Sequence, residues 1–290
     1  MGSTLIAADA AVERLAPGAT WSEGPLWLPA ERVLRWSDIP GDRILEWDAA
    51  DGSSRVHRSG VEFTNGRARW RGGVVQCSHG RRAVEFDEDG EVSILVDRFG
   101  DARLNSPNDV AVHPAGSLWF TDPPYGIVQP NEGHPGEQEY GGCYVFRWAD
   151  GELTPVVTDI LRPNGLAFSP DAGTLYVSDT SAALHDGPEH CIWAFRLVGH
   201  GATVIAADKR RLVEISPGVP DGIAVDVDGR IWTSSASGVQ VISSDGEVLE
   251  RIAVPAVVAN LCFGGDGNDE LFIAASTSLY RIRTATRGLI

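Results

Sequence analysis

Cysteine is scarce in this sequence, and its four copies are too scattered to form a metal or disulfide framework. They lie far apart and include no CxxC pair: Cys77, Cys143, Cys191 and Cys262. Zinc sites and disulfide scaffolds need closely spaced or regularly patterned cysteines. We therefore expect buried free thiols and no structural zinc.

Long apolar runs are missing as well. No stretch approaches the roughly 20 apolar residues that a membrane span requires. The first nine residues contain no basic segment followed by an apolar core, which is the pattern of a secretory signal. We therefore expect a cytoplasmic protein that binds no membrane.

Basic residues are few relative to acidic ones. The chain has 24 Lys and Arg against 40 Asp and Glu, and its formal net charge is −16. A surface of this sign repels phosphate backbones, so nucleic acid is excluded as an expected partner. Two catalytic motifs are also absent. The chain has no G-x-S-x-G nucleophile elbow and no glycine-rich phosphate loop.

Glycine, proline and tryptophan are plentiful, with 33, 17 and 9 copies. Many glycines and prolines are typical of short strands joined by tight turns. We interpret strand tryptophans such as Trp119 and Trp232 as core residues. No shift in composition suggests a linker, so we expect residues 1–290 to form a single domain.

A short motif recurs six times. It consists of a polar residue, in most copies a glycine directly after it, and then a short apolar strand. The polar residues share this leading position and are Glu23, Asn65, Asn108, Asn164, Asp221 and Asn260. Their spacing is 39 to 57 residues, close to the roughly 40–50 residues of a four-stranded propeller blade. The sequence therefore predicts an all-β, six-bladed β-propeller with four-stranded blades.

Two details of the repeat refine this prediction. The sixth repeat has room for only three strands, and residues 10–16 offer a spare strand, so we expect the N-terminal strand to close the ring in the last blade. The third and fourth periods are longest because of insertions at 122–142 and 181–190. Long loops of this kind are often binding loops or lids.

The leading polar residues carry the expected chemistry. In a propeller the first strand of each blade lines a central channel, so these residues converge at one mouth. Two carboxylates and four carboxamides form an oxygen-rich ring of the kind that hard divalent cations select. Asn-Gly and Asp-Gly are also ordinary turn formers, which is the alternative interpretation of any single copy.

Three further residues are candidates to reach this mouth and contact a substrate. His79 ends the second strand of the second blade, and a structural hydrogen bond is its alternative role. Asp122 and Tyr125 lie on the long insertion of the third blade.

Taken together, the motifs resemble the senescence-marker-protein, gluconolactonase and luciferin-regenerating-enzyme family of six-bladed propellers. The resemblance runs from about Glu23 to Ile282 and is strongest in five segments: 23–27, 104–110, 120–126, 162–166 and 220–222. The Pro-Pro-Tyr-Gly loop at 123–126 is similar to the bacterial gluconolactonase branch.

The resemblance implies one divalent metal held by Glu23, Asn164 and Asp221, with Asn108 close to metal and substrate. Calcium is the expected ion, with magnesium, manganese and zinc as alternatives. Ser106 stands where animal members have an arginine that grips sugar hydroxyls, so the choice of lactone stays open. The oligomeric state is also open.

The expected function is a metal-dependent hydrolase that opens a small-molecule lactone. The metal would polarise the carbonyl, and Asp221 would orient the attacking water. One alternative is the hydrolysis of other esters or organophosphates at the same metal, as in diisopropylfluorophosphatase. Another is a non-catalytic propeller that serves as a binding platform.

Overall fold

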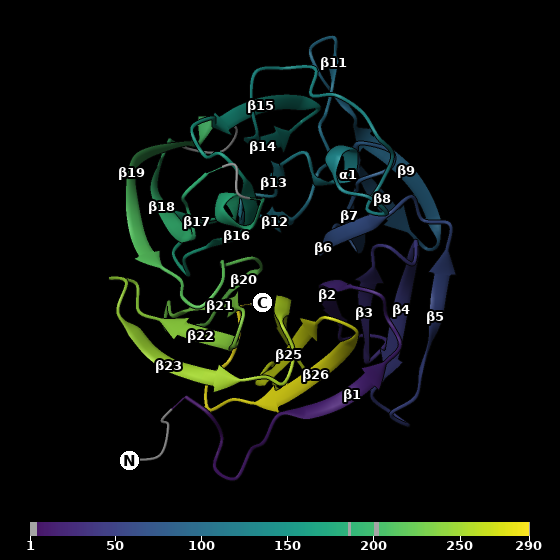
Figure 1. Cartoon of the computed structure of the whole chain (residues 1–290), viewed down its shortest axis with the longest axis vertical. Coiled ribbons are helices and arrows are strands. Elements are labelled where there is room, and N and C mark those ends of the chain that lie inside the picture. The colour runs from purple at the N-terminus through teal and green to yellow at the C-terminus, as the bar shows by residue number, and fades with distance from the viewer. Residues whose placement is uncertain (1–4, 185–186, 200–202, 290) are drawn as a thin grey trace.

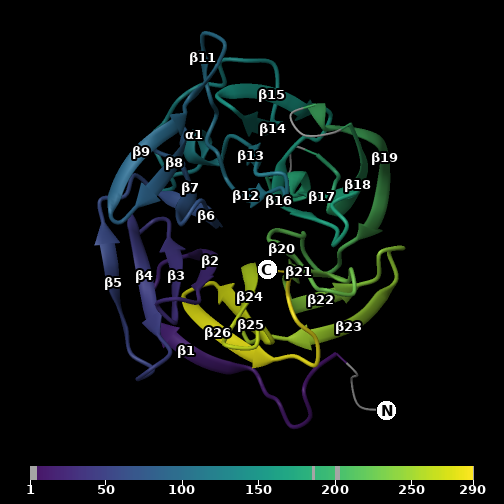
Figure 2. The same ribbon diagram turned by 180° about the vertical axis from the view of Figure 1, so that it is seen from behind.

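The chain forms six four-stranded antiparallel sheets arranged around a central channel (Figures 1 and 2). The computed structural model describes residues 5–184, 187–199 and 203–289. In each sheet the first strand of a repeat is innermost, and each innermost strand contacts the next one around the ring. The all-β, six-bladed propeller predicted from the repeat is therefore confirmed.

The blades follow one another along the chain. The first consists of β2 (Ser22–Leu28), β3 (Val33–Asp38), β4 (Arg43–Asp48) and β5 (Ser54–Ser59). The second consists of β6 (Thr64–Trp70), β7 (Gly73–Ser78), β8 (Ala83–Glu88) and β9 (Glu91–Val96). The third consists of β12 (Val110–Val112), β13 (Leu118–Asp122), β14 (Tyr144–Ala149) and β15 (Glu152–Val157).

The remaining blades complete the circle. The fourth consists of β16 (Pro163–Phe168), β17 (Thr174–Asp179), β18 (Cys191–Val198) and β19 (Ile205–Glu214). The fifth consists of β20 (Ile223–Val225), β21 (Ile231–Ser235), β22 (Gly238–Ile242) and β23 (Val248–Ala253). The sixth consists of β24 (Val258–Gly264), β25 (Glu270–Ala275), β26 (Ser278–Arg283) and β1 (Glu13–Pro17).

The ring closes through β1, which pairs antiparallel with β26 and supplies the outer strand of the last blade. The predicted N-terminal closure is confirmed, although the strand covers 13–17 rather than 10–16. The closure is also sealed by packing, since Trp27 of the first blade stacks on Phe272 of the sixth with ring centroids 5.5 Å apart. This apolar contact joins the two ends of the chain.

Apolar clusters fill the interfaces between most neighbouring blades. Trp119 and Trp232 are fully buried, each in a cluster shared by two blades. The interface between the first and second blades is bridged by polar contacts instead, such as the 2.9 Å ion pair between Arg58 and Asp87. The packed blades hold the inner strands rigidly around the channel.

The insertions carry short elements of their own. The insertion of the third blade contains α1 (Tyr125–Val128), and that of the fourth contains the 3-10 turn η1 (Ser181–Leu184). A small hairpin, β10 (Arg98–Phe99) and β11 (Ala102–Arg103), precedes the third blade. Within the described ranges, no helix is long and apolar enough to span a membrane.

Candidate functional site

The predicted polar ring lies where the inner strands begin. In four blades the ladder of the first strand shifts register at the ring residue, which is Glu23, Asn65, Asn164 or Asn260. Such bulges turn a side chain away from the regular pleat. In the third and fifth blades the paired strand starts only two residues after Asn108 and Asp221. The backbone is therefore irregular at the place where polar side chains must face the channel.

Five of the six ring residues are at least nine-tenths buried: Glu23, Asn65, Asn108, Asn164 and Asn260. Asp221 is partly exposed. Buried polar groups are costly unless they find partners, and two oxygens of the ring, Asn65 Oδ1 and Asp221 Oδ1, have no hydrogen-bond partner among the described residues.

Adjacent blades approach one another closely at the ring. A Cβ on Gly24, Gly66, Gly165 or Gly222 would lie 2.2 Å from an atom of the next blade's polar segment. Hydroxyl groups add a second link, since Thr121 Oγ1 donates to the Asn164 carbonyl at 2.7 Å. The glycine that follows each of these four polar residues is thus required for the blades to pack closely at the ring.

Acidic side chains gather at the ring. Burial raises the pKa of Glu23 well above its usual range, and the nearby charges of Asp221 and Asp109 add to this shift. Burial also raises the pKa of Asp221 from 3.8 to about 8, with further contributions from Asp109 and Glu132. Among the described residues, no arginine or lysine offsets these shifts on Asp109 or Asp221. The site therefore favours a bound cation.

Asp109 is a site residue that sequence reasoning missed. It is buried within the channel, its pKa rises to about 6 through burial, and it shares hydrogen bonding to Asn260 with Glu23. A signal was present in the sequence. Four of the six repeats have glycine after the leading residue, whereas the third has Asp109 at that place.

The donor set fits a hard divalent cation. Glu23, Asn164 and Asp221 offer carboxylate and amide oxygens, and Asp221 Oδ1 is buried without a hydrogen-bond partner. In the described part of the chain, no group of three or more His, Cys, Asp or Glu side chains is placed to hold a metal ion. A metal at this mouth would therefore need amide oxygens, such as that of Asn164, beside the carboxylates, and calcium and magnesium accept amide oxygens whereas zinc seldom does.

His79 lies beneath the ring and has no exposed surface. Its Nε2 is 3.3 Å from Asn65 Nδ2 and 3.5 Å from Asn108 Nδ2, and its Nδ1 is 2.9 Å from the Glu132 carbonyl oxygen. Burial lowers its pKa to about 4, so the imidazole is neutral at pH 7. All of its polar atoms are thus engaged by protein groups.

Asp122 and Tyr125 are also engaged in structural bonds. The Asp122 carboxylate accepts the backbone N–H groups of Asn105 and Ser106, at 2.7 and 2.8 Å, and the hydroxyl of Tyr140. It therefore holds the turn that leads to Asn108. Tyr125 is buried in α1, and its hydroxyl bonds to Thr180 Oγ1. Both residues support the wall of the mouth.

The insertion that follows α1 brings an unforeseen carboxyl group near the ring. Burial raises the pKa of Glu132 to about 7, and its charge contributes to the raised pKa of Asp221. The segment is docked at His134, whose Nε2 lies 2.8 Å from Glu62 Oε2 and whose ring meets Phe63 edge-on. No repeat includes Glu132, so the sequence carried no signal for it beyond the length of the insertion.

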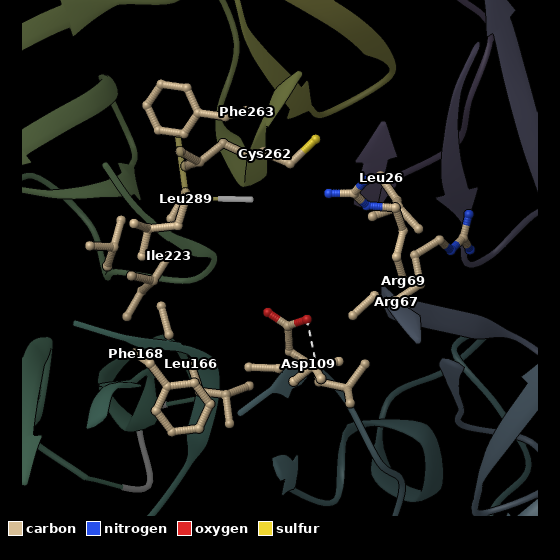
Figure 3. Close-up of a pocket in the computed structure, with 18 of the residues that line it drawn as sticks. Leu26, Arg67, Arg69, Asp109, Leu166, Phe168, Ile223, Cys262, Phe263 and Leu289 are labelled. Atoms are coloured by element: carbon tan, nitrogen blue, oxygen red, sulfur yellow. Dashed lines mark hydrogen bonds between the residues drawn. The ribbon is translucent and has the colours of Figure 1, made fainter. Parts of the chain in front are cut away.

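A cavity of about 660 Å³ occupies the other half of the channel. Its walls are largely apolar, with Leu166, Phe168, Ile223 and Phe263 on one side and Asp109 near the centre (Figure 3). Glu23, Asn164 and Asp221 do not line it, but Asn260 of the ring and Asp109 do, so the cavity adjoins the ring without including the predicted metal ligands. Leu289 also lines this cavity.

The raised acidic pKa values predict how pH affects the metal-free protein. Between about pH 4 and 8 the folded state keeps a proton on Asp221 that the unfolded chain has released. Stability must therefore fall as pH rises through this window. We expect the melting temperature of chelator-treated protein to drop from pH 5 to pH 8, and to drop less in Asp221→Asn. Equal drops in the two proteins would contradict the assignment.

Comparison with known proteins decides the family. Residues 21–277 match the family described as SMP-30/Gluconolactonase/LRE-like region. The chain belongs to this family. It is 32% identical over 300 aligned positions to the gluconolactonase of Zymomonas mobilis subsp. mobilis, covering 96% of this chain and 82% of that protein.

Solved structures from the family agree with the fold. The gluconolactonase of Xanthomonas campestris superposes with a TM-score of 0.88 at 40% identity, covering 96% of this chain and 91% of that one. Regucalcin from Agrobacterium tumefaciens, a calcium-binding protein, superposes with a TM-score of 0.79 at 20% identity, covering 97% and 96% of the two chains. The first relative is a lactone-hydrolysing enzyme, and the second shows that the family shares this fold.

Proposed function

We propose that this protein is a divalent-metal-dependent lactonase whose active site is the polar ring at one mouth of the channel. The observation that carries the proposal is the gathering of Glu23, Asp109 and Asp221, in a chain related to gluconolactonases, where no basic residue of the described ranges offsets the raised pKa values of Asp109 and Asp221. A cation is the missing partner of these acids, and a lactone is the substrate class of the relatives.

Glu23, Asn164 and Asp221 would hold the ion. Calcium is the preferred candidate, because the set contains only hard oxygen donors and a relative of the same fold is a calcium-binding protein. A bound divalent cation polarises the lactone carbonyl and stabilises the negative charge that develops on its oxygen. Asn65 and Asn260 complete the polar surroundings of these ligands.

Asp221 is proposed to orient the attacking water. It is the ring acid that remains partly exposed, so a water molecule can reach it from solvent. A neighbouring cation lowers the pKa of a carboxyl group, so Asp221 is expected to be ionised at pH 7 and able to accept a proton from the water. Asn108, two blades away from it on the ring, would hold the substrate in place.

The test is a substrate panel measured with calcium, magnesium, manganese and zinc in turn. The panel contains sugar lactones, aliphatic lactones, an aryl ester and a fluorophosphate. We expect sugar lactones to be opened fastest and only in the presence of a divalent cation. Preferential hydrolysis of the ester or the fluorophosphate, with no lactone opened under any metal, would overturn the proposal.

A further inference from the structure

Two amides of the ring share one partner. Asn65 Nδ2 and Asn108 Nδ2 both point at His79 Nε2, at 3.3 and 3.5 Å. The second distance is long, so the two amides share the acceptor unequally. Both asparagines and the histidine are buried, which leaves little room for their side chains to turn.

The chemistry of the third contact fixes the direction of these hydrogen bonds. His79 Nδ1 lies 2.9 Å from the carbonyl oxygen of Glu132, and a carbonyl oxygen can only accept. Nδ1 must therefore carry the imidazole proton. Because a neutral imidazole has only one N–H, Nε2 presents a lone pair. That lone pair can accept from an amide N–H but cannot donate to an amide oxygen.

The orientation of both asparagines follows. With the Nδ2 atoms held at His79, each amide oxygen points away from the imidazole. The Oδ1 atom of Asn65 is buried and has no hydrogen-bond partner in the protein. An unsatisfied buried acceptor of this kind costs roughly 1–3 kcal/mol, which a suitable ligand donor would recover.

We propose that His79 is a positioning residue that aims the amide oxygens of Asn65 and Asn108 into the mouth, where they accept hydrogen bonds from the hydroxyl groups of a polyhydroxylated lactone. The proposal rests on the lactonase function proposed above and adds the residue that orients the amides of the ring toward a sugar lactone. The asparagines recognise hydroxyl donors because their oxygens, not their NH₂ groups, face the ligand. A lactone without hydroxyl groups would leave these oxygens unpaired.

The same histidine connects the ring to the insertion of the third blade. Its bond to the Glu132 carbonyl makes the docked segment, with Glu132 and His134, part of what holds the imidazole. A change in that segment would therefore be transmitted to the two amides.

Two substitutions of His79 separate the two halves of its role. In His79→Asn, the amide Nδ2 can replace Nδ1 as donor to Glu132, but no acceptor remains at the place of Nε2. In His79→Gln, the longer side chain can place an oxygen near the position of Nε2, but the donor to Glu132 is lost. Both variants remove the imidazole group, so the packing contacts that they lose are similar.

The measurement is the preference ratio: kcat/KM for a sugar lactone divided by kcat/KM for an aliphatic lactone of the same ring size. We expect His79→Asn to lower this ratio about tenfold or more, the value of one or two neutral hydrogen bonds. In His79→Gln the fall should be clearly smaller. An equal loss on both substrates in His79→Asn, or equal ratios in the two variants, would overturn the proposal.

A second readout does not depend on catalysis. ¹⁵N NMR of the wild-type imidazole should show a neutral ring with its proton on Nδ1 at pH 7. A proton on Nε2, or a charged ring, would overturn the positioning role even in an active enzyme. If the wild type opens no lactone but the Nδ1–H tautomer is found, the lactonase function and the substrate class fail while the orientation of the amides stands.

Discussion

Asp221→Asn is expected to lower kcat for lactone opening by about 10²–10⁴, which is the usual contribution of general acid–base catalysis. The substitution keeps the shape of the side chain and an oxygen that can bind a metal. It removes the negative charge and the ability to take a proton from water. The result is measured as kcat at saturating metal and saturating substrate, so that weaker binding of either cannot imitate a loss of chemistry.

Asn108→Asp provides a comparison at another ring position, two blades from Asp221. Asn108→Asp adds a negative charge to the site, whereas Asp221→Asn removes one. A fall in the kcat of Asn108→Asp therefore cannot be caused by the loss of a negative charge. A turnover of Asp221→Asn close to that of the wild type, once the metal is saturating, would show that Asp221 is only a ligand. The attacking water would then be activated by another group, for which Asp109 is the acid with the largest electrostatic effect on Asp221.

Glu23→Gln is expected to weaken metal binding by at least about 100-fold, the upper end of what the loss of an outer-shell partner costs. The variant keeps the volume of a buried side chain but removes a negative charge from the proposed ion site. Calcium should therefore no longer raise the melting temperature as it does in the wild type. Isothermal titration gives the metal affinity, and thermal melts with and without calcium give the change in melting temperature.

The metal-free form distinguishes this effect from misfolding. Burial raises the pKa of Glu23, so its charged form destabilises the folded protein in the absence of a cation. Metal-free Glu23→Gln should therefore be at least as stable as the metal-free wild type at pH 8. Glu46→Gln is the matched control, because Glu46 is buried in the same blade but pairs with Arg35 and Arg55. It should lower stability and leave metal affinity unchanged, and equal metal affinities in the wild type and Glu23→Gln would exclude Glu23 as a ligand.

The fold was largely predictable because every blade of the propeller needs the same short motif at the start of its inner strand. Each blade needs a polar residue that leads its inner strand and, in four blades, a glycine that lets the next blade approach to within contact. This period is visible without any structure. The closing strand was placed a few residues too early, because its pairing with β26 depends on a partner about 265 residues away, and local sequence does not set that register.

The candidate site was predictable only for residues that belong to the repeated motif. Glu23, Asn164 and Asp221 share the leading position, so propeller geometry brings them to one mouth. Asp109 was missed because it occupies the glycine position of a single blade, and Glu132 because it belongs to an insertion that no other blade has. The role of His79 depends on which neighbours its two nitrogens meet, and that information exists only in three dimensions.

The most direct test of the proposed function is a calcium titration of chelator-treated protein, with hydrolysis of a sugar lactone as the readout. We expect no activity above background before calcium is added, full recovery at one bound ion per chain, and no recovery in Glu23→Gln at the same calcium concentration. Undiminished hydrolysis by the wild type in excess chelator would contradict a metal-dependent lactonase at this mouth.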